Sequence, residues 1–290
     1  MKIHRKKSQE GQVLLIIIML LATIITVVTT VSFRSTTETQ INKLEEESQK
    51  TLAAAEAGIE KAIAAKVASG NSQKFNDPSD PNNLNMQNLS GIDLANSSVN
   101  VTSNTGRDFV TPLIQKDQQY TFYLSNYNNA ASPPFSSPYP NQITVYYGSE
   151  SGCTTLALEI TRVSGLSAPY TVSRYISDVG GGIVTNPAGS GTNNVQGGSG
   201  ATIGNVIFNC RTTGIPWTAN TILMIVRTLG NTAAEGRTKL AIRGSSAVLS
   251  LPPQGKYIVS EAKSQSGVIK KIQLFQSLPQ IPAEFFVSTF

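Results

Sequence analysis

The sequence predicts an α+β chain in which one long N-terminal helix precedes an all-β globular domain. No charged residue occurs between Gly11 and Phe33, and helical periodicity continues from that run to residue 69. Beyond residue 98, short β-type runs replace this periodicity. We therefore expect five consecutive regions, which are a basic leader (1–11), a transmembrane helix (12–33), an amphipathic helix extension (34–69), a polar loop region (70–104) and an extracytoplasmic β domain (105–290).

The uncharged run is long enough to cross a bilayer. A helix over these residues measures roughly 34 Å, slightly more than the thickness of a hydrocarbon core. A cleaved secretory signal is the weaker alternative, because the apolar core is long and no small-x-small site follows it. The threonines in the run can bond to carbonyls of their own helix or face neighbouring helices. These are Thr23, Thr26, Thr29 and Thr30.

The charge distribution orients the chain in a membrane. Four of its 23 Lys and Arg residues and one of its 18 Asp and Glu residues precede Gly11, so the rest of the chain is nearly neutral. A basic flank favours the cytoplasmic side, and we expect a single-pass protein of the inner membrane with its C-terminal domain outside. No basic cluster with interleaved aromatic residues occurs, so we predict no nucleic-acid partner. The basic residues of the leader are Lys2, Arg5, Lys6 and Lys7.

The helical pattern continues beyond the apolar run without an evident break. No proline occurs between residues 1 and 77, and we expect one helix over 12–69, roughly 87 Å long, that ends near Ser69 and Gly70. A separate surface helix or a coiled-coil stalk is the alternative. Apolar or small residues recur at steps of three and four along one face. They are Ile41, Leu44, Ser48, Leu52, Ala55, Ile59, Ile63 and Val67.

The remainder of the chain predicts ten strands and long loops. The last two strands read as a hairpin, in which Ile258, Ser260 and Ala262 share one face and Tyr257, Val259 and Glu261 share the other. The Gly-rich stretch 180–200 is predicted to be a surface loop. The predicted strands are 98–102, 120–124, 142–147, 154–163, 170–176, 202–210, 221–227, 239–243, 256–263 and 268–275.

Few residue types suited to catalysis or metal binding occur outside the leader. The one histidine is His4, so the exported part has no imidazole for a catalytic triad or a zinc site. Asp77 and Asp80 lie among asparagines, but the Gly and distal Glu of a calcium loop are absent, and we expect neither a metal nor a cofactor. Cys153 and Cys210 either form a disulfide or remain two buried thiols.

Two segments of the helix carry a resemblance to a known family. These are K-S-Q-E-G-Q-V-L-L-I-I-I-M-L-L at 7–21 and T-L-A-A-A-E-A-G-I-E-K-A at 51–62. A basic leader ending in glycine, an apolar helix, an amphipathic continuation and a β domain together resemble the type IV pilin-like proteins. The likeness is greatest to the PilX and type II secretion K-type minor pilins, and it covers the helix and, more loosely, the terminal strands.

The resemblance implies a structural role rather than an enzymatic one. A prepilin peptidase would cut after Gly11 and leave Gln12 as the mature N-terminus. The helix would then leave the membrane and pack against other pilin subunits in a type IV pilus or pseudopilus, which displays the β domain on the cell surface. The residues expected to pack in the membrane and in the filament are Leu14, Leu15, Ile16, Ile17, Ile18, Leu20 and Leu21.

Two departures from the family pattern favour a minor subunit. Major pilins carry Glu at the fifth mature position, where it neutralises the N-terminal amine of a neighbour, and this chain has Ile16 there. They also commonly have a helix-breaking proline where this chain has Phe33. Two other function classes remain open, namely a membrane-anchored adhesin or binding module that does not polymerise, and a tethered enzyme using a Ser-Lys or carboxylate mechanism.

Overall fold

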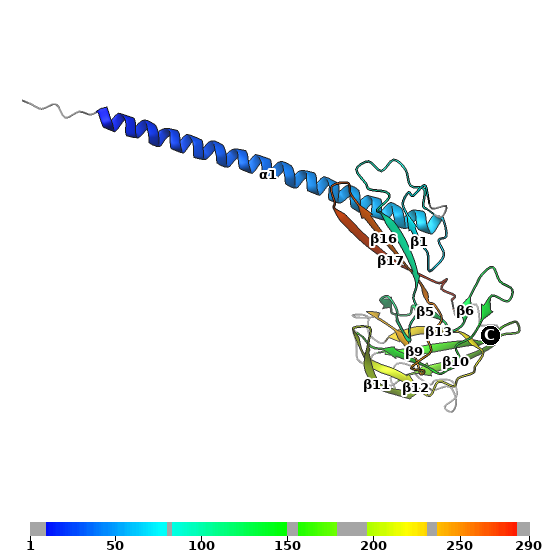
Figure 1. The fold of residues 1–290 in the computed structure, drawn as a ribbon. Coiled ribbons are helices and arrows are strands. Elements are labelled where there is room, and N and C mark those ends of the chain that lie inside the picture. Colours follow the sequence, from blue (N-terminus) through cyan, green and yellow to red (C-terminus); the bar gives the residue numbers. More distant parts are fainter. Residues whose placement is uncertain (1–9, 80–82, 150–155, 179–195, 231–236, 283–290) are drawn as a thin grey trace, which may run out of the picture. The chain divides into compact units, whose positions relative to one another are not determined.

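One long helix and a set of β-strands form two compact units in the computed structural model (Figure 1). The structure describes residues 10–79, 83–149, 156–178, 196–230 and 237–282. Unit 1 contains Met1–Val67, Ser72–Asn100 and Val259–Gln273. Unit 2 contains Ala68–Asn71, Val101–Ile258 and Leu274–Phe290. The basic residues of the predicted leader, Cys153 and Asp80 lie outside the described residues.

Helix α1 (Glu10–Ala64) runs for 55 residues without interruption, as the sequence predicts. It ends before Ser69, however, because Lys66 adopts a left-handed conformation with φ of 51°. The amide of Lys66 donates to the carbonyl of Ile63 (3.0 Å) and that of Val67 to the carbonyl of Ala62 (3.1 Å). This pair of bonds is a Schellman cap, which normally uses glycine. The buried Val67 follows the cap at once, so the chain turns back towards the core at that point.

In unit 1 the C-terminal part of α1 packs against an antiparallel sheet. The sheet has the strand order β1 (Ser72–Lys74), β2 (Ser98–Ser103), β16 (Gly255–Lys263) and β17 (Ile269–Ser277). A short turn joins β16 to β17, in which the amide of Ser264 donates to the carbonyl of Val268 (2.8 Å), so the predicted hairpin is confirmed. The chain passes between the two units within β2, β16 and β17.

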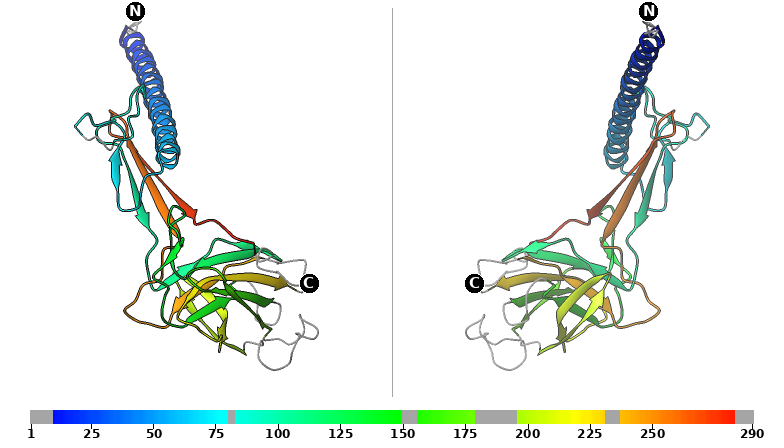
Figure 2. Two further views of the ribbon diagram at one scale, coloured as in Figure 1. Left: turned by 90° about the vertical axis from the view of Figure 1, so that its right-hand side faces the viewer. Right: turned by 90° about the vertical axis from the view of Figure 1, so that its left-hand side faces the viewer.

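Small residues allow α1 to approach this sheet closely (Figures 1 and 2). A Cβ atom built on Gly58 would lie 2.5 Å from Oγ of Ser260 and 2.7 Å from the ring of Phe75. The alternation predicted for β16 is confirmed, since Ile258, Ser260 and Ala262 are fully buried and their neighbours are half-buried. The buried small residues of the helix are Thr51, Ala54, Ala55, Gly58 and Ala62.

The predicted stripe of α1 is buried only in its second half. Ile41, Leu44 and Leu52 are 48%, 56% and 41% exposed, whereas Ala55 and Ile59 are buried. The sheet therefore covers the helix only from about Thr51 onwards, and it covers small side chains more completely than large ones.

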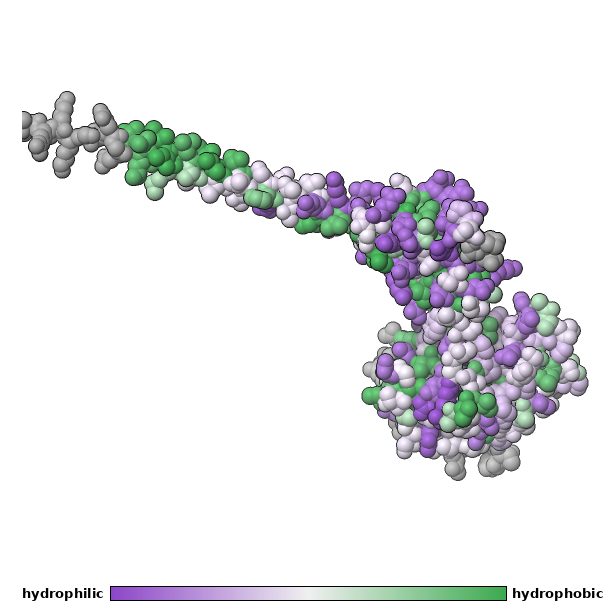
Figure 3. All heavy atoms as spheres, viewed as in Figure 1, coloured by the Kyte–Doolittle hydropathy of each residue, from purple (hydrophilic) through white to green (hydrophobic). Residues whose placement is uncertain are grey.

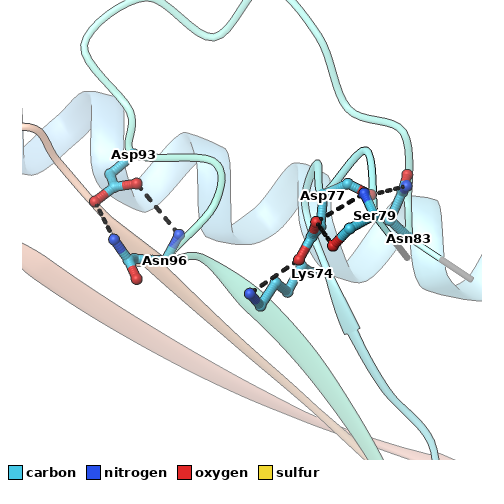
Figure 4. A network of polar contacts seen from close by, with 6 residues as sticks. All are labelled: Lys74, Asp77, Ser79, Asn83, Asp93 and Asn96. Atoms are coloured by element: carbon cyan, nitrogen blue, oxygen red, sulfur yellow. Dashed lines mark hydrogen bonds and ion pairs between the residues drawn. The ribbon is translucent and has the colours of Figure 1, made fainter.

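The polar region after α1 has four buried apolar residues that stand apart in the sequence, and it also has short-range hydrogen bonds. Oδ1 of Asp77 accepts bonds from the amide (3.0 Å) and the hydroxyl (2.5 Å) of Ser79, and Oδ2 lies 3.0 Å from Nζ of Lys74 (Figure 4). Asp93 accepts two bonds from Asn96. Both carboxylates are thus engaged by the chain itself. The apolar residues are Phe75, Leu84, Met86 and Ile92.

Unit 2 is a sandwich of two antiparallel sheets. One has the strand order β10 (Thr171–Ser177), β9 (Leu156–Ser164), β13 (Thr221–Gly230) and β5 (Gln119–Tyr123). The other has the order β11 (Gln196–Ile203), β12 (Val206–Thr213), β8 (Ile143–Tyr147), β15 (Ala241–Gly244) and β3 (Asp108–Val110). Two short pairs join β4 (Ile114–Gln115) to β14 (Arg237–Thr238) and β6 (Asn126–Tyr127) to β7 (Phe135–Ser136).

Apolar side chains from both sheets meet in one core. Phe122 and Leu124 lie at one sheet, Val145 and Tyr147 come from the other, and all four are fully buried. Burial raises the pKa of Tyr147. The core is therefore a conventional sandwich interior in which each sheet contributes one face.

One predicted strand is wrong in extent. The stretch 202–210 was expected to be continuous, but Gly204 and Asn205 form a turn with φ of 52° and 65° that separates β11 from β12. The expected loop over 180–200 is also wrong at 196–200, which belongs to β11. Gly200 lies so close to the carbonyl of Phe208 that no side chain fits, so this glycine permits close strand pairing rather than a loop.

Candidate anchor and assembly surface

The N-terminal half of α1 exposes a continuous apolar surface, seen as the green stretch in Figure 3. From Val13 to Ala64 the helix contains a window of mean hydropathy 2.8 that is long and apolar enough to cross a membrane. None of that window is buried. Because a core helix of a globular domain would be covered, this segment needs either lipid or other apolar helices around it.

The residues predicted to pack in the membrane or filament all contribute to this surface. Each is at least half exposed, from 50% for Ile17 to 61% for Leu15, and they lie all around the helix. A helix that is apolar on every side is suited to lipid or to a bundle interior rather than to one flank of a domain. These residues are Leu14, Leu15, Ile16, Ile17, Ile18, Leu20 and Leu21.

Threonine hydroxyls in this half of α1 bond to their own helix. The hydroxyl of Thr23 donates to the carbonyl of Leu20 (2.8 Å), and that of Thr26 to the carbonyl of Ala22 (2.8 Å). Thr30 likewise donates to the carbonyl of Thr26 (2.7 Å). These bonds satisfy the hydroxyl donors inside an apolar surrounding, which confirms one of the two roles expected for these residues.

The apolar surface ends sharply at its C-terminal side. Arg34 directly follows Phe33, which is 72% exposed, and Nε of Arg34 lies 3.0 Å from the carboxylate of Glu38. The pKa of Glu46 is lowered by its hydrogen bond to Lys50, one turn of helix later. Charged pairs therefore cover the helix between the apolar half and the part that packs against the sheet.

The predicted processing residues lie in the first turn of α1. Gly11 and Gln12 directly follow Glu10, the first helical residue. They adjoin the apolar surface, which begins at Val13. The structure thus places the predicted cleavage position next to the start of the apolar segment.

The structure describes one of the two cysteines of the predicted disulfide. Cys210 is fully buried in β12 and is disulfide-bonded. Cys153 lies outside the described residues, so the pairing of the two stays a prediction.

Unit 2 contains an ion pair of good geometry but no metal cluster among its described residues. Nε and Nη2 of Arg243 each lie 2.7 Å from a carboxylate oxygen of Asp108, which joins β15 to β3. The hydrogen bond to Asp108 raises the pKa of Arg243, whose guanidinium also lies over the ring of Tyr146. This arrangement is complete without a ligand and is structural in character.

Sequence patterns did not reveal two features. The close approach at Gly58 depends on Phe75 and Ser260, which are distant in sequence from the helix. The second feature is a pair of solvent-accessible hollows in unit 2, lined in part by Pro252, Pro253 and Pro279. The proline clusters are visible in the sequence, but nothing in their spacing shows that they meet.

Comparison with known proteins gives no assignment. No family model, no curated protein and no solved structure matches this chain.

Proposed function

We propose that this chain is a minor pilin-like structural subunit of a bacterial type IV pilus or a related pseudopilus, acting by assembly or priming and by surface display. The main support for the proposal is a single uninterrupted helix of which one half is uncovered and the other half is packed against a sheet. Its first half is apolar on all sides and uncovered, and its second half is packed against a four-stranded sheet. A subunit that moves from a bilayer into a filament core needs such a helix.

The energetics of that transfer support the proposal. Lipid tails and a bundle of apolar helices offer similar surroundings, so extraction from the membrane does not expose the apolar half to water. The threonine hydroxyls are satisfied within the helix and need no new partner in either place. In this proposal the apolar half of the helix packs in the filament core, and unit 2 is displayed outside it.

Cleavage by a prepilin peptidase after Gly11 is part of the proposal. The mature chain would begin at Gln12, and Ile16 would replace the glutamate through which bulk subunits pair with a neighbour's amine. An unpaired buried amine is costly, so a position at a filament end is favoured over one inside the shaft. The proposed location is the inner membrane before assembly, with unit 2 outside.

The second candidate is a membrane-anchored binding module that does not polymerise. The hollows of unit 2 favour it, because a purely structural subunit needs no such surface. Both candidates share the anchor and the display of unit 2, and they differ in whether the chain enters a filament.

A charge placed in the apolar half tests the assembly role. In a strain that makes filaments, Leu20→Lys is expected to remove the chain from the sheared-filament fraction, because a lysine near the centre of the apolar segment costs about 3 kcal/mol in a bilayer. Thr39→Lys is the matched control, since residue 39 lies among charged residues on the exposed helix. Recovery of the Leu20→Lys chain in filaments at the control level would contradict the proposal.

A further inference from the structure

Two adjoining hollows lie in unit 2 beside the short hairpin β6–β7. The first has a volume of about 400 Å³ and the second of about 370 Å³. Asn126 and Pro253 line both, so the two hollows are direct neighbours, and together they are called the groove here. All lining residues belong to the segments of unit 2. Volumes of this size are typical of small-molecule sites.

The walls of the groove are fixed before any ligand arrives. The ring of Tyr127 packs against the rings of Tyr123 (5.2 Å between centroids) and Phe135 (5.5 Å). The buried side chain of Gln254 fastens the proline segment, because its Nε2 donates to the carbonyls of Tyr123 (2.6 Å) and Pro252 (2.8 Å). A preformed wall lowers the entropic cost of binding.

The opposite wall is fastened as well. The hydroxyl of Tyr123 donates to the carbonyl of Pro279 (2.7 Å), and the amide of Leu278 donates to the carbonyl of Gln254 (3.0 Å). These bonds connect the end of β17 to the proline segment. The groove is therefore bounded on both sides by backbone that cannot move independently.

The polar groups in the groove are mostly neutral. Side-chain amides come from Asn126 and Gln276, and neither makes a side-chain hydrogen bond to another described residue. Hydroxyl groups come from Ser103 and Ser277. Amides and hydroxyls both donate and accept, which matches the hydroxyl groups of a sugar.

The charge of the lining limits the class of ligand. Lys256 is the one charged residue among the described residues that line the two hollows. A nucleic acid or polyphosphate requires several cations, and a divalent metal requires carboxylates. An ordinary apolar ligand would cover the exposed amides of Asn126 and Gln276 without offering them a hydrogen-bond partner.

From this chemistry we propose that the groove binds a short oligosaccharide, with the ring of Tyr127 and the proline walls against the apolar faces of the sugars and the amides of Asn126 and Gln276 on their hydroxyl groups. The site serves either candidate function, because it requires only that unit 2 be displayed.

The test uses the full chain in a detergent without a sugar headgroup, applied to an array of neutral and uronate-containing oligosaccharides. We expect binding to a subset of the array. Asn126→Ala and Gln276→Ala each remove one side-chain amide from the groove. Each substitution is expected to weaken oligosaccharide binding at least about fivefold. Asn129→Ala is the matched control, because Asn129 is exposed on the same loop and lines neither hollow.

A role for the Tyr127 ring needs its own variant. Tyr127→Leu keeps an apolar side chain against Tyr123 and Phe135 but removes the flat ring, and binding is expected to fall while the circular dichroism spectrum stays unchanged. The proposal is overturned if no oligosaccharide on the array binds at millimolar concentration. It is equally overturned if Asn126→Ala and Gln276→Ala bind as tightly as the Asn129→Ala control.

Discussion

Gly58 is a residue at which α1 lies very close to the sheet of unit 1. Its hydrogen atoms face Ser260 and Phe75, both of which are fully buried and cannot easily move aside. The hydroxyl of Ser260 has no hydrogen-bond partner among the described residues, so this contact depends on shape alone. Glycine is a poor helix former, and its presence in mid-helix is explained by this contact.

Gly58→Ala is therefore expected to destabilise unit 1. The gain in helix propensity is about 1 kcal/mol, but overpacking costs about 1–3 kcal/mol and the neighbours have no free space. We expect a lower midpoint of thermal unfolding, measured by circular dichroism. Ala53→Ser adds one atom at an exposed position of the same helix and is expected to leave the midpoint unchanged. An unchanged or raised midpoint for Gly58→Ala would show that the helix packs less closely.

Asp77 provides a second test at the scale of a residue. The bonds from Ser79 and Lys74 favour its charged form and lower its pKa from 3.8 to about 2. Because the folded pKa lies below the unfolded one, the stabilisation is complete above pH 3.8 and is lost as the pH falls towards 2. NMR titration of the Asp77 carboxyl should find a midpoint near 2.

Ser79→Ala serves as the comparison for this titration. It removes the largest cause of the shift, so the Asp77 midpoint is expected to rise towards 3.8. Asp93, whose pKa is lowered by Asn96, is expected to keep its own midpoint in the same variant. A midpoint for Asp77 that does not respond to Ser79→Ala would contradict the network in Figure 4.

At the scale of elements, several strands follow directly from alternation in the sequence. In β16 the small and apolar side chains at 258, 260 and 262 read as one face, and these residues are buried. Burial on one face produces that pattern, so the sequence carries the signal. The uncharged run predicts the apolar half of α1 for a similar reason. Apolar residues occur on every side of the helix there, and all sides are exposed alike.

Other elements could not be predicted because their cause is distant in sequence. The Gly-rich stretch 197–200 indicates a loop when read locally, but it belongs to a strand paired with β12, and β12 leaves no space for a side chain at Gly200. The predicted end of α1 near Ser69 is wrong because Lys66 performs the capping role usually taken by glycine. The groove of unit 2 depends on segments around residues 126, 253 and 278, which no periodicity connects.

Strand β12 carries the disulfide-bonded Cys210, and the partner of this cysteine can be tested. We expect non-reducing peptide mapping to find Cys153 linked to Cys210. Removing such a bond commonly costs about 2–5 kcal/mol, so Cys210→Ser should lower the stability of unit 2 by that amount. Cys153→Ser should have the same effect. A protein that is labelled by thiol reagents without reduction would contradict the pairing.

For the whole molecule, we expect that a substitution in one unit destabilises that unit and leaves the other unit unaffected. Unit 1 gathers residues from both ends of the chain around α1, an association that local sequence patterns do not contain. Hydrogen exchange measured by mass spectrometry should show that Gly58→Ala increases exchange in β1 and in 259–263, with little change in β9 and β13. Cys210→Ser should give the reverse distribution. Equal effects in both units would indicate that the chain unfolds as one body.

The central claim is that α1 is an anchor that is processed and then packed in a filament. The most direct measurement is the mass of the N-terminal peptide from the envelope and sheared-filament fractions. We expect a peptide that begins at Gln12 in both fractions, whereas Gly11→Leu should give the uncut chain. If every recovered chain begins at Met1, the anchor is permanent and the proposed pilin role is wrong.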